Sequence, residues 1–361
     1  MKGGVSSHMI AIAKNTNKLV TPSNQLVTDT LQRPLRDLRI SLTDQCNFRC
    51  TYCMPKEIFG PKYQFLKKQN ILNFDELMNV VKGFVDCGVK KIRLTGGEPL
   101  LRAGICDFIK QLKTIPEIED IALTTNGEFL PPMAKKLKEA GLDRVTISLD
   151  AISDQIFSEM NGRNLNTDKI LLAIDSARDA GLAPKVNMVV IKGVNDHDIM
   201  PMVNFFKDKK TTLRFIEFMD VGNHNKWNKG QVISGKEILD LIKKSYAIEP
   251  VDASYLGEVA KRYRFIDDGT EFGLITSVSQ SFCSDCSRAR ISADGKVYTC
   301  LFSQSGTDLL EPIRSGASVE ETTQLIKNIW THRHDRYSEL RDEIISRMQN
   351  NTKIESSYIG G

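Results

Sequence analysis

Three cysteines stand close together in this 361-residue chain, at a spacing that suits a soft metal centre. Cys46, Cys50 and Cys53 form a C-x3-C-x2-C pattern directly after an alternating run, residues 38–43, that predicts a β-strand. Closely spaced thiolates bind iron–sulfur clusters, and three ligands on a cubane that ordinarily takes four leave one iron open. A zinc knuckle is the alternative, although structural zinc prefers four closed ligands. We therefore expect an iron–sulfur cluster with an open site.

A second triplet, with the spacing C-x2-C-x13-C, consists of Cys283, Cys286 and Cys300. Asp294-Gly295 stands between two alternating runs and predicts a two-residue hairpin turn. Pairing Ala293 with Lys296 and counting outward sets Ala289 opposite Cys300, which brings Cys300 near the other two thiols. Three thiolates then meet without a fourth ligand. The alternatives are a second cluster with an open iron and a zinc ribbon that lacks one ligand.

Two arginines lie inside the second triplet, at Arg288 and Arg290. Side chains two residues apart on a strand point to the same face, so both guanidinium groups share one face. Paired guanidiniums beside an open iron would suit a polyphosphate. Exposed strand arginines are the alternative, since arginine is mostly found at the surface.

The elements that must position these residues follow an alternating pattern. Short β-rich runs are separated by helical stretches, such as residues 74–87 and 167–180. Asn73 and Glu76 form the pattern of a capping box at the start of the first of these stretches. The six predicted strands are residues 38–43, 91–95, 121–125, 144–149, 185–191 and 213–219. This alternation predicts parallel βα units with right-handed crossovers.

One face of the predicted sheet is polar, which is unusual for parallel strands that helices cover on both sides. Arg39, Arg93 and Lys185 fall on that face by alternation, and the sixth strand is predicted to set Glu217 and Met219 on one face. A closed eight-stranded barrel fills its interior with apolar side chains. Six strands with a polar face instead suggest an open, partial barrel that holds a polar ligand. Residues 318–350 are expected to form a helix that covers the open side.

The bulk composition excludes several classes of protein. Net charge is +4, which is a poor argument for nucleic acid, and 41% of the residues are hydrophobic. No apolar run approaches the roughly 18 residues that span a bilayer, and no secretory signal is evident, so we expect a cytoplasmic protein that uses cysteines as metal ligands rather than in disulfides. Six of the eight cysteines fall in the two triplets, whereas Cys87 and Cys106 lie in helical patterns and are expected to be small buried hydrophobic residues. We expect a flexible segment at 1–30, a barrel at 31–240, a C-terminal domain at 241–345 and a tail at 346–361.

The first triplet resembles the signature of the radical S-adenosylmethionine (SAM) superfamily, since an aromatic residue, Tyr52, precedes the last cysteine. Gly96-Gly97-Glu98-Pro99, after the second strand, is similar to the superfamily's motif that meets the amino group of SAM. The resemblance implies a partial (βα)6 barrel whose open iron binds SAM, and whose reduced cluster cleaves it to a 5′-deoxyadenosyl radical. It also implies cofactor contacts from Tyr52, Gly97, Ser148 and Met219.

Both triplets, the Arg-x-Arg pair and the terminal Gly360-Gly361 together resemble the GTP 3′,8-cyclase family (molybdenum cofactor biosynthesis protein A), from about Arg33 onward. The resemblance implies a lyase that converts GTP to (8S)-3′,8-cyclo-7,8-dihydroguanosine 5′-triphosphate in the first step of molybdenum cofactor (molybdopterin) biosynthesis. It implies two [4Fe–4S] clusters, the second of which binds guanine. The implied catalytic residues are Arg288, Arg290, Gly360 and Gly361, and the implied GTP-binding residues are Arg39, Arg93, Thr124, Lys185, Arg288 and Arg290.

The same resemblance implies partners: a flavodoxin or ferredoxin-like electron donor and a downstream pyranopterin monophosphate synthase. A homodimer is left open, and neither nucleic acid nor a membrane is expected. Two other functions remain as alternatives. A radical SAM peptide maturase with an auxiliary cluster would usually carry more auxiliary cysteines and a peptide-binding wing, and a zinc-binding module would have no catalytic activity.

Overall fold

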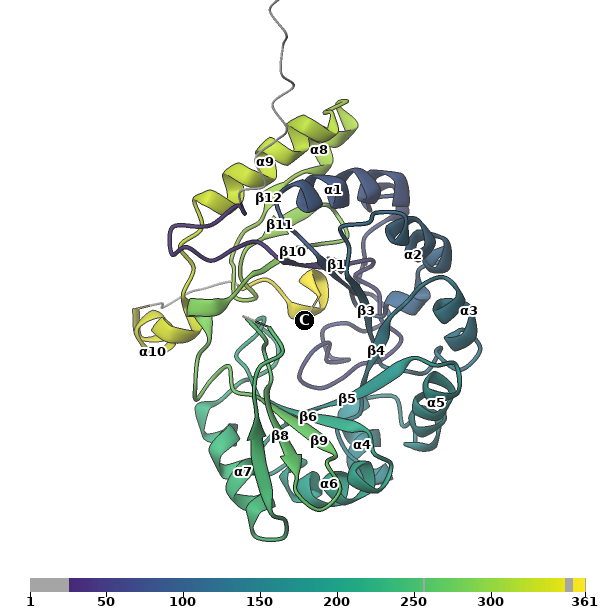
Figure 1. The fold of residues 1–361 in the computed structure, drawn as a ribbon, viewed down its shortest axis with the longest axis vertical. Helices are drawn as coiled ribbons and strands as arrows, with labels where there is room; N and C mark the ends of the chain where they lie inside the picture. Colours follow the sequence, from purple (N-terminus) through teal and green to yellow (C-terminus); the bar gives the residue numbers. More distant parts are fainter. Residues whose placement is uncertain (1–25, 256, 348–352, 361) are drawn as a thin grey trace, which may run out of the picture.

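A computed structural model describes residues 26–255, 257–347 and 353–360. Their strands form one twelve-stranded sheet with the order β12-β11-β10-β1-β2-β3-β4-β5-β6-β9-β8-β7. Figure 1 shows the sheet curling around a central space, with the helices on its outer side and the C-terminal end of the chain inside. The architecture is the open, partial barrel that the polar strand faces predict.

The six predicted strands are all present and pair in parallel with their neighbours. They are β1 (Asp37–Ser41), β2 (Lys91–Thr95), β3 (Asp120–Thr125), β4 (Arg144–Ser148), β5 (Ala183–Val190) and β6 (Thr212–Glu217). β10 (Arg288–Ile291) adds to β1 and β9 (Glu271–Ile275) adds to β6, both in parallel. Antiparallel strands complete the two edges: β11 (Lys296–Tyr298), β12 (Thr307–Asp308), β8 (Lys261–Phe265) and β7 (Ile248–Val251).

Helices connect the parallel strands and cover the outside of the sheet (Figure 1). They are α1 (Phe74–Asp86), α2 (Ile105–Lys113), α3 (Ala134–Glu139), α4 (Asp154–Asn161), α5 (Asp168–Asp179), α6 (Ile199–Asp208) and α7 (Gly235–Lys243). The predicted capping box opens α1: the Glu76 backbone N–H donates to Asn73 Oδ1 at 2.8 Å, and the Asn73 N–H donates to Glu76 Oε2 at 2.7 Å. The remaining helices follow the barrel: α8 (Leu310–Arg314), α9 (Val319–Thr331), α10 (Tyr337–Arg347) and α11 (Ser356–Ile359).

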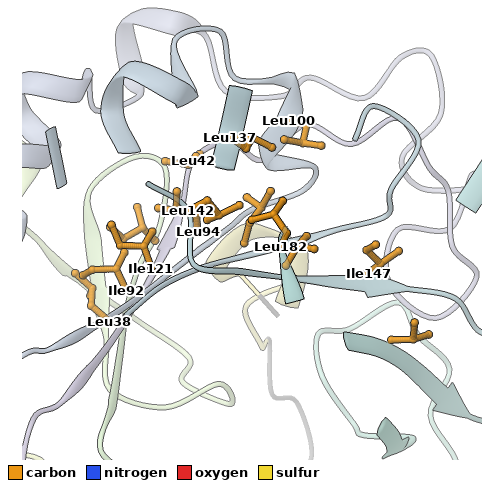
Figure 2. Packing of buried hydrophobic residues seen from close by; sticks show 14 of the residues in the cluster. Leu38, Leu42, Ile92, Leu94, Leu100, Ile121, Leu137, Leu142, Ile147 and Leu182 are labelled. Carbon is orange, nitrogen blue, oxygen red and sulfur yellow. The ribbon is translucent and has the colours of Figure 1, made fainter. Parts of the chain in front are cut away.

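The hydrophobic core lies between the outer face of the sheet and these helices. Leu38, Ile92 and Ile121, from three adjacent strands, are buried and gather beside one another in Figure 2. Their sequence neighbours Arg39 and Arg93 point to the opposite face, because side chains alternate along a strand. Burial of the apolar face therefore fixes which polar side chains enter the central space.

The C-terminal strands do not form a separate layer, because β7 to β12 extend the barrel sheet at both edges. The predicted boundary at residue 240 falls inside α7. Residues 1–25 of the predicted flexible segment lie outside the described residues, but residues 26–30 are packed against the fold. Val27 is buried, and the buried Asp29 accepts from Arg33 Nε at 2.6 Å.

The predicted helix at 318–350 is two helices with different positions. α9 packs on the outside of α1, so closely that a Cβ at Gly83 would lie 3.0 Å from Ile326 Cδ1. α10 lies on the open side of the curled sheet, as Figure 1 shows. Its Arg341 donates to Asp220 Oδ1 at 2.9 Å and to the Ser277 carbonyl at 2.8 Å, after β6 and β9. The expectation that a helix covers the open side therefore holds for α10 and is wrong for α9.

The predicted hairpin exists, but its register is shifted by one residue. Arg290 pairs with Tyr298, and the Ser292 N–H donates to the Lys296 carbonyl at 2.9 Å, so the loop has three residues rather than two. Gly295 takes a φ of +82° in this loop. A glycine in the left-handed conformation is typical of three-residue hairpins, which explains the difference.

Candidate active site

A cavity of about 530 Å³ occupies the centre of the barrel. All six predicted GTP-binding residues line it: Arg39, Arg93, Thr124, Lys185, Arg288 and Arg290. They come from β1, β2, β3, β5 and β10, and each occupies a strand position whose side chain points away from the helices. Alternation along the strands is thus what gathers residues that are far apart in the sequence.

The cavity is strongly basic. Nine lysine and arginine side chains and four carboxylates line it within the described residues. Burial, together with the charges of Arg93 and Arg144, lowers the pKa of Arg214 to about 9. Burial and the neighbouring Arg288 likewise lower the pKa of Arg290 to about 9. Cations that destabilise one another in this way gain from an anion, so the cavity favours a polyanionic ligand.

Arg144 and Arg214 line the cavity but were not among the predicted residues. Arg144 Nε donates to Asp120 Oδ1 at 2.8 Å, whereas Arg214 Nη2 donates only to a hydroxyl, Thr146 Oγ1, at 3.0 Å. Strand alternation could have identified Arg214. The sixth strand was predicted to run to Met219, but β6 ends at Glu217. The prediction that Glu217 and Met219 share a strand face is therefore wrong. The Glu217 carboxylate instead accepts N–H groups of the packed segments outside the cavity.

The second triplet lies on the wall of this cavity, with Cys283, Cys286 and Cys300 all among its lining residues. Arg288 Nη2 donates to Cys286 Sγ at 3.5 Å. Burial opposes ionisation of Cys286, but the charges of Arg288 and Arg333 outweigh it and lower the pKa to about 6. The thiolate is the form that binds metal, so this environment suits a ligand.

A buried ionic cluster that the sequence analysis did not identify fixes the backbone of this triplet. Arg33 Nη1 donates to the Cys283 carbonyl at 2.8 Å, and Arg333 Nη1 donates to the Cys286 carbonyl at 2.6 Å. Asp29 accepts from both arginines, at 2.6 and 3.5 Å. The N-terminal segment and the end of α9 therefore hold the cysteine pair together.

The first triplet lies in the loop that follows β1. The Cys53 N–H donates to the Cys50 carbonyl at 3.0 Å, and the Phe48 N–H donates to Cys46 Sγ at 3.4 Å. Burial raises the pKa of Cys46 to about 12 and that of Cys53 to about 11. Within the described residues, no three His, Cys, Asp or Glu side chains are arranged so as to hold a metal ion. The donor sets nevertheless fit, since each triplet supplies the three thiols that an open-site cubane requires.

Of the four predicted SAM contacts, Met219 lines the central cavity, whereas Tyr52, Gly97 and Ser148 are not among its lining residues. The Tyr52 hydroxyl donates to Asp150 Oδ2 at 2.7 Å, and burial raises the pKa of Asp150 to about 6. Ser148 ends β4 beside Asn187 of β5. A Cβ at Gly97 would lie 2.2 Å from the Gln45 carbonyl oxygen, so this glycine is required by the approach of the cysteine loop itself.

Glu98 does not present a free carboxylate to a ligand. Its Oε1 accepts from the Leu100 N–H at 3.0 Å and from Thr125 Oγ1 at 2.8 Å, and its Oε2 accepts from the Asn126 N–H at 2.8 Å. Burial raises the pKa of Glu98 to about 7. The residue therefore ties together the loops that follow β2 and β3.

The C-terminal segment enters the centre of the barrel (Figure 1). Arg290 Nη1 donates to the Gly360 carbonyl, and Ser356 Oγ lies 3.9 Å from Cys53 Sγ. A Cβ at Gly360 would lie 2.2 Å from Thr95 Cγ2, and its φ is +74°, so a side chain is excluded here. Gly361 lies outside the described residues. The segment thus reaches from the first triplet to the arginine pair.

Comparison with known proteins identifies two family models in the chain. The Radical SAM superfamily model matches residues 40–206, and the Molybdenum Cofactor Synthesis C model matches residues 211–339. A GTP 3′,8-cyclase from Staphylococcus carnosus is 52% identical over 336 residues, which cover 93% of this chain and 99% of the relative. A GTP 3′,8-cyclase from Staphylococcus haemolyticus is 51% identical over the same shares.

Solved structures share the fold at low identity. SuiB from Streptococcus suis, bound to S-adenosylmethionine, has a TM-score of 0.58 at 14% identity over 91% of this chain and 76% of that chain. Native anSMEcpe with bound AdoMet has a TM-score of 0.56 at 17% identity, over 81% and 82%. With both family models in place and half of all residues shared with these cyclases over nearly the full length, the chain belongs to the GTP 3′,8-cyclase family of the radical SAM superfamily.

Proposed function

We propose that this protein converts GTP to (8S)-3′,8-cyclo-7,8-dihydroguanosine 5′-triphosphate, the first step of molybdenum cofactor biosynthesis. The observation that carries the proposal is the basic cavity, with one cysteine triplet on its wall and the C-terminal segment running from it to the other triplet. A [4Fe–4S] cluster on Cys46, Cys50 and Cys53, together with SAM, supplies hydrogen-abstracting radical chemistry when bound. Met219, Tyr52, Gly97 and Ser148 are the residues that we assign to SAM.

The cavity residues suit a nucleoside triphosphate in charge and in size. A volume of about 530 Å³ is within the usual range for small-molecule sites. Arg39, Arg93 and Lys185 would bind phosphate oxygens, with Arg214 as a further donor whose Nε has no hydrogen-bond partner among the described residues. Thr124 Oγ1 already accepts from Arg93 Nη1 at 3.2 Å and holds that guanidinium in place.

The second triplet would hold a second [4Fe–4S] cluster, which would supply an open iron to a ligand in the cavity. Supporting this, Cys283, Cys286 and Cys300 line the same cavity as the basic side chains. A guanine ring at that wall would leave its triphosphate directed toward the arginines of β1 and β2. The basic side chains of the barrel would then hold the phosphates, the wall that carries the second triplet would bind the base, and the ribose would lie between them.

We assign the catalytic roles to Arg288, Arg290, Gly360 and Gly361. Arg290 donates to the Gly360 carbonyl, so the tail and the guanidinium position one another. A segment without side chains at its end can approach a ribose closely, and its backbone amides can donate hydrogen bonds there.

The remaining partners belong to the same proposal: a flavodoxin or ferredoxin-like electron donor and a downstream pyranopterin monophosphate synthase, in the cytoplasm. Residues 31–240 would cleave SAM, while residues 241–345 would carry the second cluster. No helix among the described residues is long and apolar enough to cross a bilayer.

Product analysis tests the proposal. The anaerobically reconstituted protein is incubated with GTP, SAM and dithionite, and the products are separated by chromatography and identified by mass spectrometry. We expect 5′-deoxyadenosine together with a new isomer of GTP, because C3′ loses a hydrogen and the guanine ring gains one. GTP that is recovered unchanged while SAM is cleaved would overturn the assignment of substrate.

A further inference from the structure

We infer that residues 353–355 and the loop after β6 form a latch that holds the C-terminal segment inside the barrel, with Glu355 and Asn223 as positioning residues for the reaction on GTP. The latch is defined here as residues 220–224 together with residues 353–355. Its consequence for catalysis rests on the proposed function, whereas its existence rests on contacts alone.

The backbone of Lys353 is paired with a single side chain. The Lys353 N–H donates to Asn223 Oδ1 at 2.7 Å, and Asn223 Nδ2 donates to the Lys353 carbonyl at 2.5 Å. An asparagine amide carries both a donor and an acceptor, so it satisfies both backbone groups at once. This pairing fixes the direction in which the chain passes the loop.

Glu355 adds a second set of contacts to the same loop. Its Oε1 accepts from the Asn223 N–H at 2.9 Å and lies 2.8 Å from His224 Nδ1. A Cβ at Gly222 would lie 2.1 Å from Glu355 Oε2, and Gly222 has a φ of +71°. The positive φ favours glycine at this turn, and a side chain here would displace the carboxylate from its present position.

Asp220 connects the latch to the helix that bridges the open sheet. Lys353 Nζ donates to Asp220 Oδ2 at 2.7 Å. The same carboxylate accepts from the Tyr337 hydroxyl at 2.5 Å and from Arg341 Nε at 2.9 Å, both on α10. The Asp220 side chain is only 5% exposed. The anchor therefore stands on a buried, fully engaged carboxylate rather than on a free surface charge.

The latch lies close to the residues that the tail must reach. Glu355 is followed directly by α11, where Ser356 Oγ lies 3.9 Å from Cys53 Sγ, and Gly360 accepts from Arg290. Five residues of extended chain span at most about 17 Å. Fixing Glu355 thus limits how far Gly360 can move. On the other side of the loop, Asn225 Nδ2 donates to the carbonyl of Met219 at 2.8 Å, so the loop also holds a proposed SAM contact.

Hydrogen exchange of the full-length, reconstituted protein tests the latch without reference to turnover. In Glu355→Ala and Asn223→Ala, we expect backbone amides 356–360 to exchange at least about tenfold faster than in the parent. The matched control is Lys229→Ala, which removes an exposed ion pair with Asp342 in the same connection after β6. Its tail should exchange at the parent rate, as should α1 in every variant. Unchanged tail exchange in both latch variants would overturn the inference.

Kinetics then separates a positioning role from a merely structural one. In Glu355→Ala, kcat for GTP should fall by about tenfold or more while KM for GTP changes by less than about twofold, because the cavity arginines remain in place. More 5′-deoxyadenosine should form for each GTP consumed. Glu355→Gln keeps an acceptor for the Asn223 N–H, so this variant should retain more activity than Glu355→Ala. If Glu355→Ala fails to fold, Glu355→Gln is measured in its place. Faster tail exchange with an unchanged kcat would overturn the positioning role.

The hydrogen-exchange and kinetic experiments together also distinguish a failure of the latch from a failure of the proposed function. If the parent protein cleaves SAM but leaves GTP unchanged, the proposed function fails, while the exchange measurement still decides the latch. If the parent converts GTP and neither latch variant changes exchange or kcat, the latch alone fails.

Discussion

Individual side chains around the cavity divide into those free to bind an anion and those already engaged by the protein. In the part of the chain that the structure describes, Arg214 Nε has no partner, whereas Asp120 holds Arg144, and three N–H and O–H donors hold Glu98. Strand alternation and the family resemblance together predicted the six lining residues. Neither could predict that both carboxylate oxygens of Glu98 accept hydrogen bonds from neighbouring loops, because the donors of the loop after β3 are distant in the sequence.

Replacing one cavity arginine should weaken GTP more than SAM. In Arg288→Ala, we expect the Kd for GTP to rise about ten- to a hundredfold, since a charge-assisted hydrogen bond contributes about 1.5–3 kcal/mol. Calorimetric titration of the reconstituted protein with each ligand measures this. Lys229→Ala, whose exposed side chain lies outside the cavity lining, is the control. An unchanged affinity for GTP would show that Arg288 does not contact the substrate.

Glu98 should make the stability of the cluster-free protein depend on pH. Burial raises its pKa from 4.5 to about 7, so the folded state holds the proton more tightly than the unfolded state does. The stabilisation of the folded state by this bound proton is fully present below pH 4.5 and is lost as the pH rises through 7. At about 1.4 kcal/mol for each pKa unit, the loss is roughly 3 kcal/mol.

Urea unfolding of the parent and of Glu98→Gln measures this contribution, because glutamine does not titrate. The unfolding free energy of the parent, measured relative to that of Glu98→Gln, should fall between about pH 4.5 and pH 8 and then level off. A difference that is independent of pH would contradict the shifted pKa.

At the scale of elements, the loops after β1 and β2 fit together through glycine. The Gly97 N–H donates to the Thr43 carbonyl at 2.7 Å, and its Cα faces the Gln45 carbonyl. From the sequence, these glycines belong to a motif that is similar to the one that meets the amino group of SAM. The structure shows that the cysteine loop itself makes the close approach, which pattern reading cannot distinguish. The hairpin at Asp294-Gly295 was predicted correctly in place and wrongly in register, because a left-handed glycine suits a three-residue loop as well as a two-residue one.

Gly97→Ala should therefore separate the two loops and disturb the first triplet. We expect a loss of about 1–3 kcal/mol in unfolding free energy, since the clash is with backbone and cannot be relieved by a side-chain rotation. Iron bound after reconstitution should fall as well. Gly193→Ala is the control: its Cβ would meet nothing within 4 Å, so only the strain of a φ of +75° remains, about 1 kcal/mol. Iron content equal to that of the parent in Gly97→Ala would contradict this role.

At the scale of the whole molecule, one sheet carries both halves of the site. β10, beside the second triplet, pairs with β1, which leads into the first. The alternation of strands and helices predicted the barrel over residues 38–219. It could not predict that β9 and β10 extend the sheet in parallel, because parallel partners that are distant in sequence leave no local signal. The latch contacts of residues 353–355 were beyond sequence reading for the same reason.

The two triplets should nevertheless assemble separately, because each takes its thiols from its own segment. Cys50→Ala should lose the iron of the first site and all cleavage of SAM, while Cys286→Ser should lose the iron of the second and keep the first. Each variant should bind roughly half of the parent's iron, which metal analysis and EPR spectroscopy can measure. Cys106→Ala, in α2, should bind as much iron as the parent. Loss of both clusters in either triplet variant would contradict this division.

We propose that the barrel holds the ribose of GTP between the two triplets, with C3′ directed at the site of SAM cleavage. GTP that carries deuterium at C3′ tests it most directly, in a single anaerobic turnover followed by mass analysis of 5′-deoxyadenosine. We expect 5′-deoxyadenosine to gain one mass unit and to form at the same rate as the cyclised nucleotide. Unlabelled 5′-deoxyadenosine, formed while GTP keeps its deuterium, would contradict it.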